Sequence, residues 1–348
     1  MPSQSPLLVA IPLVALTVSL LTSRWLASRA GSRLSPLDHP NERSLHSAPV
    51  PRSGGLGLLT GLAIPLLAAM ALGPIVGELA WMVPALTLVA LVSFLDDLGD
   101  ISPLTRLAAH LLAAGLLMVG GLQWTHLDPP GLAVHFPAWI AIGLTALFVV
   151  WMINLYNFMD GMDGFAGGMA VVGFTALALL GWRGGEPLYA LASLCVAASS
   201  AGFLASNFPP ARLFLGDAGS SSLGLLAAGF SLWGTRLELF PLWTAWLAFS
   251  PFIVDATWTL LTRIARHERI WEPHRSHHYQ RLVLAGWSHR KTLLRGYLVM
   301  GAAAACAVAS PGLSPPDQWM LLGGWAMIYG LIHLKVRLVE QGFPVERP

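Results

Sequence analysis

The sequence has few charged residues and few cysteines. Asp, Glu, Lys and Arg make up only 11% of its 348 residues, whereas soluble domains carry roughly 25%. Because 55% of the residues are hydrophobic and the mean hydropathy is +0.63, the chain cannot bury its apolar side chains in a soluble core. Cys195 and Cys306 both fall in apolar runs, so neither a disulfide framework nor a thiolate metal site is supported.

Internal repeats and low-complexity tracts are also missing. No period of roughly 20 to 50 residues recurs, which predicts one integral domain over residues 1–348. The net charge of +2 is small, and no basic patch suits nucleic acid. The first apolar run has no basic residue before Arg24 and is too long for a cleavable signal peptide, which predicts a retained first helix.

What the sequence does contain is a series of long apolar runs. A helix needs about 20 apolar residues to cross about 30 Å of hydrocarbon, and eleven such runs are present. They lie near residues 7–27, 55–75, 79–96, 103–122, 136–156, 165–182, 186–206, 219–235, 239–262, 293–311 and 317–337. The sequence therefore predicts an all-α polytopic membrane protein with about eleven transmembrane helices.

The positions of Lys and Arg predict the orientation in the membrane. If the N-terminus lies outside, all of the twenty Lys and Arg residues except Arg183 and Arg236 fall on the inner side. Such a bias is typical of cytoplasmic segments. We therefore expect a periplasmic N-terminus, a cytoplasmic C-terminus, and two long cytoplasmic loops at residues 28–54 and 263–292.

Acidic residues gather at the inner ends of two runs. The third run ends SFLDDLGD, where a continuing helix would place Asp96 and Asp100 on one face with Asp97 beside them. Carboxylates about 5 Å apart repel by about 3 kcal/mol at an effective dielectric near 20. The fifth run ends NLYNFMDGMDGFAGG, with its amides and carboxylates at three-residue spacing: Asn154, Asn157, Asp160 and Asp163. That spacing predicts one helix face, and the glycines would let a nucleotide approach the backbone.

A third acidic motif precedes the eighth run. Asp217 lies in FLGDAGSSS, just before Ser220 and its neighbouring serines open a predicted helix. A helix N-terminus attracts anions, so Asp217 could hold a Mg²⁺ ion whose other ligands are phosphate oxygens. Phe214 could stack a base. An ordinary serine N-cap is the alternative interpretation of the serine run.

The predicted loop before the tenth run is rich in His and Arg. Its sequence WEPHRSHHYQRL contains His274, Arg275, His277, His278 and Arg281, which could together grip a pyrophosphate. Spacings of three and one without Cys argue against zinc, and a solvated basic loop remains the plain alternative.

Asp255 lies inside an apolar run. An ionisable residue in a membrane costs about 2.5 to 3.5 kcal/mol on insertion scales. Both a function and a helix-packing hydrogen bond stay open for it.

The inner-face aspartates favour an enzyme, because phosphoryl transfer needs mainly metal, positioning and neutralised charge. A secondary transporter of a phosphorylated or nucleotide solute is one alternative, although transporter sites lie near the membrane midplane. Another lipid-linked prenyl-phosphate enzyme is the second. Aromatic prenyltransferases have an N-x₃-D-x₃-D pattern, whereas this chain has N-x₂-D-x₂-D from Asn157 to Asp163.

Taken in order, the motifs resemble those of the polyprenyl-phosphate N-acetylhexosamine-1-phosphate transferases of glycosyltransferase family 4. The resemblance rests on DHPNERSLHSAPVPRSGGLG, SFLDDLGD, NLYNFMDGMDGFAGG, FLGD and the His-rich loop, and it covers residues 24–295. It implies a bacterial inner-membrane enzyme, with its active site on the cytoplasmic side, that moves a sugar 1-phosphate from a UDP-N-acetylhexosamine to undecaprenyl phosphate and releases UMP. It also implies Mg²⁺, or Mn²⁺ in its place, and leaves a homodimer open.

The resemblance also implies a role for individual residues. Asp96, Asp97 and Asp160 match catalytic positions, Asp217 matches the metal ligand, and Arg52 matches a residue at the lipid phosphate. The implied nucleotide-sugar site contains Asn154, Asn157, Asp163, Asn207, Phe214, His274, Arg275, His277 and His278. Asp100, where the lipid I synthase has Lys, makes the resemblance closer to the branch that initiates O-antigen and common-antigen synthesis. The loop reads HRSHH where the common-antigen enzyme has His-x-His-His, and HRSH followed by YQ resembles O-antigen initiators that use N-acetylfucosamine or N-acetylquinovosamine.

Overall fold

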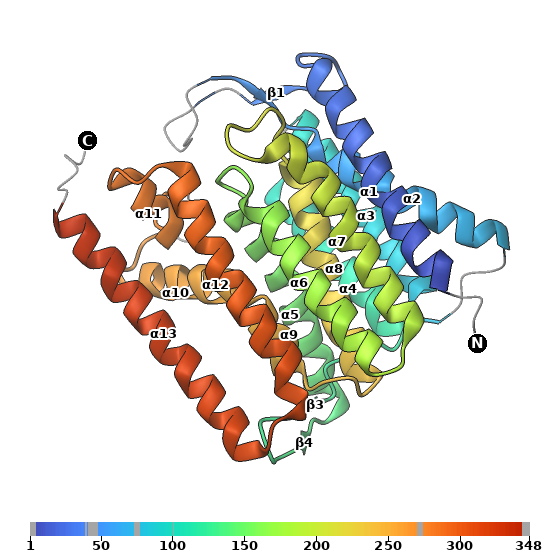
Figure 1. Ribbon diagram of the computed structural model, residues 1–348, viewed down its shortest axis with the longest axis vertical. Helices are drawn as coiled ribbons and strands as arrows, with labels where there is room; N and C mark the ends of the chain where they lie inside the picture. Colours follow the sequence, from blue (N-terminus) through green and yellow to red (C-terminus); the bar gives the residue numbers. More distant parts are fainter. Residues whose placement is uncertain are drawn as a thin grey trace.

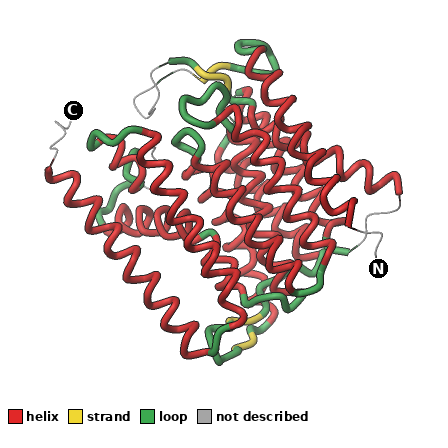
Figure 2. Tube along the Cα trace, in the orientation of Figure 1, coloured by secondary structure: helices red, strands yellow, loops and turns green. Residues whose placement is uncertain are grey.

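The apolar runs form helices in a computed structural model, which describes residues 5–38, 40, 48–72, 77–99, 101–269 and 274–342. The long helices are α1 (Ser5–Ser28), α2 (Gly54–Leu72), α3 (Leu79–Leu98), α4 (Pro103–Val119), α5 (Ala138–Met159), α6 (Phe165–Arg183), α7 (Pro187–Asn207), α8 (Gly216–Arg236), α10 (Ser250–Ala265), α12 (His289–Ala309) and α13 (Pro315–Gly342). The short elements are α9 (Leu242–Ala248), α11 (His278–Leu284), the 3₁₀ helix η1 (Ser310–Gly312), and the antiparallel pairs β1 (Leu37–Asp38) with β2 (Val50–Pro51) and β3 (His126–Leu127) with β4 (Val134–His135). Figure 2 shows how completely helix dominates the fold.

Seven of the described helices are long and apolar enough to cross a membrane, namely α1, α3, α5, α6, α7, α12 and α13. The prediction of an all-α membrane protein is therefore confirmed. The prediction that residues 239–262 form one continuous span is wrong, because α9 ends at Ala248 and α10 begins at Ser250. Pro251 explains the break, since its ring would clash with the carbonyl four residues earlier if the helix continued. Figure 1 shows α10 lying across the direction of α12 and α13.

Helix α8 lies at the centre of the fold. Every residue from Ala218 to Gly234 is buried, and α8 packs against α3 and α5. The helix is rich in Gly, Ala and Ser, which let neighbouring backbones approach closely. At Gly224 an added Cβ would lie only 2.4 Å from the carbonyl oxygen of Met152 on α5. The small residues of this motif therefore fix α8 between the two helices that carry the acidic motifs.

One end of the bundle brings distant segments together. The amide of Phe214 donates to the carbonyl of Pro51 at 2.8 Å, and the amide of Gly54 donates to the carbonyl of Phe214 at the same distance. The segment before α2 therefore lies against the segment before α8. Figure 1 shows β1 at this end of the molecule and β3 and β4 at the opposite end.

Helix α13 forms an outer edge of the molecule (Figure 1). Of its 28 residues only Trp325 and Val336 are buried. Large apolar side chains such as Met320, Leu331 and Leu338 are exposed on it. An apolar surface of this kind suits a helix surrounded by lipid.

Candidate active site

The N-terminus of α8 is capped by a carboxylate from α3. Oδ1 of Asp97 accepts a hydrogen bond from the amide of Asp217 at 3.1 Å, and Oδ2 accepts one from the amide of Ala218 at 3.0 Å. Gly216 has a φ of +71°, and a Cβ there would lie 2.9 Å from Oδ2 of Asp97. Glycine is required at this turn both for its conformation and for the close approach.

The serines of α8 do not cap their helix. The hydroxyl of Ser220 donates to the carbonyl of Gly216 at 3.0 Å, and that of Ser222 donates to the carbonyl of Ala218 at 2.6 Å. The alternative interpretation of the serine run as an N-cap is therefore wrong. Asp97 takes that role, because a carboxylate both accepts the free amides and interacts favourably with the positive end of the helix dipole.

Asp96 and Asp217 share one arginine, Arg106. Nη1 of Arg106, in the first turn of α4, lies 2.7 Å from Oδ2 of Asp96 and 3.9 Å from Oδ2 of Asp217. Both carboxylates therefore lie beside the same guanidinium. The sequence interpretation missed Arg106. Its position ten residues after Asp96 in the sequence could not place it, because the turn between α3 and α4 decides where its side chain lies.

The predicted continuation of the third helix is wrong. Helix α3 ends at Leu98, and Gly99 is extended with a φ of −174°. Asp96 instead accepts the amide of Ile101 at 2.8 Å, which fixes the turn into α4. Asp100 lies outside the described residues.

Arg52 reaches the same place from the segment before α2. Its Nη2 donates to the backbone carbonyl of Asp97 at 2.6 Å. Its Nε is buried and has no hydrogen-bond partner among the described residues. The guanidinium is thus held beside the carboxylates.

The acidic motif between α5 and α6 is a turn rather than one helix face. Helix α5 ends at Met159, so Asp160 and Asp163 lie beyond it, and the prediction that the motif stacks on one face is wrong. On the helix, Asn157 donates from Nδ2 to Oγ of Ser220 at 3.1 Å. Asp163 accepts the amide of Ala211 at 3.0 Å.

Asn207 holds the other side of this turn. It accepts the amide of Gly164 at 2.8 Å and donates to the carbonyl of Leu213 at 2.9 Å. Asp163 and Asn207 thus tie the α5–α6 turn to the segment that precedes α8.

Asn154 and Phe214, two residues predicted to bind the nucleotide, make contacts that do not themselves indicate a nucleotide site. The side chain of Asn154 donates to the carbonyl of Val150 within α5 at 2.8 Å, so it is engaged by its own helix. Phe214 joins the site through its backbone, which pairs with Pro51 and Gly54. A base-stacking role for its ring stays a prediction.

Asp160 lies where the acidic segments meet. Loss of solvation raises its pKa well above the usual range, and the negative charges of Asp217, Asp97 and Asp163 raise it further. We call Asp96, Asp97, Asp160 and Asp217, with Arg52 and Arg106, the aspartate cluster. Its excess negative charge calls for a cation or a proton.

The donors of the aspartate cluster suit the implied magnesium ion. The carboxylates of Asp96 and Asp217 lie beside the same arginine, Arg106, and Mg²⁺ prefers oxygen ligands. In the described part of the chain no three His, Cys, Asp or Glu side chains form a metal-holding group. Mg²⁺ commonly takes one or two carboxylates and completes its shell with substrate phosphates and water. Asp217, with Asp96 beside it, fits such a partial site.

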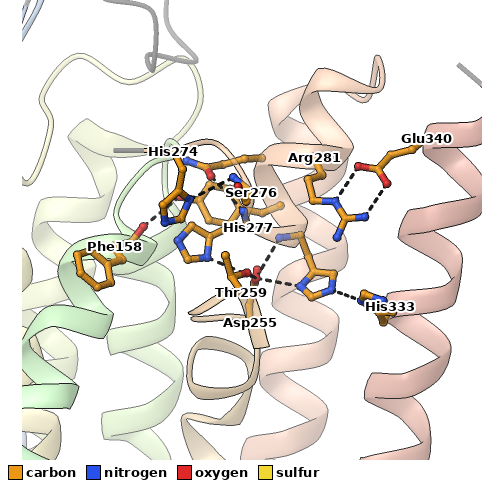
Figure 3. Close-up of polar contacts among 12 residues, drawn as sticks. Phe158, Asp255, Thr259, His274, Ser276, His277, Arg281, His333 and Glu340 are labelled. Atoms are coloured by element: carbon orange, nitrogen blue, oxygen red, sulfur yellow. Dashed lines mark hydrogen bonds and ion pairs between the residues drawn. The ribbon is translucent and has the colours of Figure 1, made fainter. Parts of the chain in front are cut away.

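A second polar cluster joins α10, α11 and α13 (Figure 3). Oδ1 of Asp255 accepts the backbone amide of His278 at 3.0 Å and lies 2.9 Å from Nδ1 of the same residue. Nε2 of His278 lies 2.9 Å from Nδ1 of His333 on α13. Asp255, which the sequence left open between function and packing, therefore organises the predicted His loop. We call Asp255, His274, His277, His278 and His333 the histidine cluster.

The other loop residues surround this centre. Nδ1 of His277 lies 3.5 Å from Oδ1 of Asp255, and its ring stacks on Tyr279 with centroids 5.8 Å apart. Burial, followed by the charges of His277 and Arg263, lowers the pKa of His274 to about 4, so it is neutral at pH 7. Arg275 is half-buried and forms no hydrogen bond or ion pair with the described residues.

Arg281 pairs with a carboxylate of α13. Its Nε and Nη2 lie 2.7 and 2.5 Å from the two carboxylate oxygens of Glu340 on α13. Its predicted role in gripping a pyrophosphate stays a prediction. A bidentate pair of this geometry is a strong contact between α11 and α13.

Tyr279 connects the two clusters. Its hydroxyl donates to the carbonyl of Phe158 at 3.4 Å, at the end of α5. A Cβ at Gly161 would lie 2.3 Å from the same hydroxyl, so glycine is needed for this close approach. The histidine cluster is thereby held against the turn that carries Asp160.

Known proteins share these segments. The model of glycosyl transferase family 4 matches residues 79–235, which run from α3 to α8 and so contain all four carboxylates of the aspartate cluster. The probable undecaprenyl-phosphate N-acetylglucosaminyl 1-phosphate transferase of Bacillus subtilis is 32% identical to this chain over 84% of it and 82% of the relative.

Two further relatives have similar names. The decaprenyl-phosphate N-acetylglucosaminephosphotransferase of Mycobacterium tuberculosis is 31% identical over 95% of this chain and 90% of its own. The undecaprenyl-phosphate alpha-N-acetylglucosaminyl 1-phosphate transferase of Yersinia pestis is 25% identical over 86% and 83%. The likeness therefore covers most of each protein.

Proposed function

Because the chain belongs to the polyprenyl-phosphate N-acetylhexosamine-1-phosphate transferases of glycosyl transferase family 4, we propose that it transfers an N-acetylhexosamine 1-phosphate from a UDP-sugar to undecaprenyl phosphate. The products are the undecaprenyl-diphosphate-sugar and UMP. The observation that carries the proposal is the meeting of Asp96, Asp97 and Asp217 at the first turn of α8. Carboxylates at a helix N-terminus suit a metal-bound pyrophosphate.

The chemistry is a displacement at the β-phosphorus. An oxygen of the lipid phosphate forms a bond to the phosphorus that carries the sugar, and the bond from that phosphorus to the bridging oxygen breaks, releasing UMP. Mg²⁺, or Mn²⁺, held by Asp217 would offset the pyrophosphate charge when bound. Arg52 would hold the lipid phosphate, and Asp96 or Asp160 would orient it or accept its proton.

Asp97 receives a different role from the one its motif suggested. Both of its carboxylate oxygens accept amides of α8, so we assign it to positioning Asp217. Direct attack without a covalent intermediate is the simpler path for this arrangement. A sugar-phosphoryl enzyme trapped in the absence of lipid would contradict it.

The nucleotide sugar would lie between the two clusters. Asn157, Asp163 and Asn207 fix the α5–α6 turn and the segment before α8, and Phe214 would stack uracil. His274, Arg275, His277 and His278 would close the site on the sugar and pyrophosphate side, supported by the contact of Tyr279 with Phe158.

We further propose that the site faces the cytoplasm. The bias of Lys and Arg supports a periplasmic N-terminus, eleven crossings with α9 and α10 as one broken crossing, and the bacterial inner membrane. The polyprenyl chain would stay in the lipid while its phosphate meets the nucleotide sugar at the membrane surface.

The sugar is best sought by direct assay. The names of the three relatives all contain N-acetylglucosamine, which makes UDP-N-acetylglucosamine the first candidate, whereas the HRSHH loop favours a deoxy-sugar of O-antigen synthesis. Purified protein would be incubated with undecaprenyl phosphate, Mg²⁺ and a panel of UDP-N-acetylhexosamines. We expect UMP and a lipid-linked sugar with at least one donor. Failure with the whole panel, by protein that is folded in detergent, would reject the proposed reaction.

A further inference from the structure

Helix α13 touches the rest of the protein chiefly through α11. Its surface is otherwise largely exposed and apolar. His333 and Glu340 nevertheless make close contacts with α11, His333 with His278 at 2.9 Å and Glu340 with Arg281 through two bonds. They lie seven residues apart, two helical turns, and so project from the same side of α13. These contacts therefore form a polar seam, the pairs of His333 with His278 and Glu340 with Arg281, along one side of a helix whose remaining surface is apolar.

The seam ends on a segment that has little stability of its own. Helix α11 has only seven residues, and an isolated helix of that length is marginal in water. From within the fold, α11 is held by Asp255 through His278 and by the contact of Tyr279 with Phe158. From outside, it is held by α13. The bidentate pair fixes the rotation of α11 about its axis, because a planar guanidinium matches a carboxylate in one orientation.

Both ring nitrogens of His278 are hydrogen-bonded. Nδ1 lies 2.9 Å from Oδ1 of Asp255 and donates to it, because a carboxylate only accepts, and Nε2 lies 2.9 Å from Nδ1 of His333. His333 therefore holds the second nitrogen of a ring whose first nitrogen is held by Asp255. The imidazole cannot rotate without breaking contacts to two helices.

We propose that α13 is a positioning helix for the nucleotide-sugar site and that Glu340 and His333 are its positioning residues. They act through Arg281 and His278 to hold residues 274–279 against the α5–α6 turn. The expected change in the KM for the UDP-sugar rests on the proposed function. The expected loosening of residues 274–279 does not. A loss of either contact should loosen the loop and weaken use of the UDP-sugar without altering the site of the lipid phosphate.

The ion pair is tested by removing one charge and then exchanging both. Glu340→Gln should raise the KM for the UDP-sugar about tenfold to a hundredfold, the range of lost supporting contacts, with little change in the half-saturating concentration of undecaprenyl phosphate. Arg281→Glu should do the same, and the double variant Arg281→Glu with Glu340→Arg should recover most of the loss. Gln341→Ala is the control, because Gln341 is exposed beside Glu340 on α13.

The imidazole contact is tested separately. His333→Ala should raise the same KM, and His333→Asn, which can still donate a hydrogen bond, should recover part of it. An equal fall in kcat for every donor, with KM unchanged, would contradict positioning at the sugar site.

Hydrogen exchange of residues 274–284 in the full-length protein gives a readout that does not need activity. Faster exchange in Glu340→Gln and His333→Ala than in wild type and Gln341→Ala supports the proposal. Exchange that is unchanged in the variants overturns the proposal, and so does faster exchange with an unchanged KM for the UDP-sugar. A charge-exchanged double variant whose exchange is as fast as that of the single variants also overturns it. Absence of UMP release by wild type would instead reject the proposed function, while the exchange rates still decide whether α13 holds the loop.

Discussion

The aspartate cluster and the histidine cluster are neighbours, but the fold holds them in different ways. In the aspartate cluster, Asp97 binds two amides of the central helix α8 and Arg52 binds a carbonyl of α3. In the histidine cluster, His278 binds a side chain of α10, which begins after the break from α9, and a side chain of the peripheral helix α13. The first is built on the backbone of the central helix α8 and of α3, and the second on side chains of short or peripheral helices.

This difference suggests a division of labour. A metal and phosphate site needs fixed geometry, because small displacements of reacting groups are costly. A loop that receives and releases a nucleotide sugar must open, and such elements come from the less stable parts of a fold. We therefore expect changes in the aspartate cluster to abolish turnover and changes in the histidine cluster to alter affinity and selectivity.

The largest effect is expected at Asp217. Asp217→Ala should lower UMP release by about a thousandfold or more, since it removes the metal ligand and with it the charge stabilisation. The matched control is Glu238→Gln, an exposed acidic residue just beyond the other end of α8. Mg²⁺-dependent turnover at the wild-type rate in Asp217→Ala would remove the metal assignment.

A somewhat smaller loss, accompanied by lower stability, is expected at Asp97. Asp97→Asn keeps one acceptor oxygen for α8, whereas Asp97→Ala keeps none, so activity should fall about a hundredfold in the first and further in the second. The thermal midpoint in detergent should fall in the same order. If Asp97→Asn loses activity without any change in the midpoint, Asp97 acts on the substrate rather than on α8.

Substitution of Arg106 tests whether a metal ion or this arginine neutralises the carboxylates of the aspartate cluster. Arg106→Gln removes a positive charge 2.7 Å from Asp96 and 3.9 Å from Asp217. We expect the maximal rate to fall, while the Mg²⁺ concentration for half-maximal activity falls about tenfold, because the carboxylates lose a competing cation. An increased Mg²⁺ requirement would show that Arg106 helps to bind the substrate phosphates instead.

The smallest effect is expected at Arg275, in the loop that carries the histidine cluster. Arg275→Gln should change the ranking of UDP-sugars by about tenfold in kcat/KM, and leave the Mg²⁺ dependence as in wild type. Kinetics across the donor panel measure both. No change for any donor would make the loop the solvated basic segment that its sequence also allowed.

The elements could largely be predicted from the sequence, because each apolar run is helical over most of its described part. The positions at which the helices are interrupted were harder to predict. Pro251 gave a local signal for the break between α9 and α10, but a proline is also tolerated inside α1, where Pro12 lies. The end of α3 at Leu98 depends on the turn that Asp96 stabilises through Ile101, a contact outside the periodicity of the helix.

The candidate site was predictable in its residue types and less so in its contacts. Asp97 was chosen for its motif, yet its binding to α8 joins residues 120 positions apart. Arg106, His333 and Glu340 were missed because each belongs to a helix whose neighbours are set by tertiary packing. Sequence spacing reports neighbours on one helix, and these three residues act across helices.

The central claim is that the aspartate cluster transfers a sugar 1-phosphate rather than a sugar. It is tested most directly with UDP-N-acetylglucosamine, or the best donor of the panel, carrying a radioactive β-phosphate. With undecaprenyl phosphate and Mg²⁺, we predict that the label enters the lipid fraction, that UMP forms in equal amount without label, and that Asp217→Ala prevents both. Label that remains in the water-soluble nucleotide, released as UDP, while the sugar enters the lipid, would contradict the account.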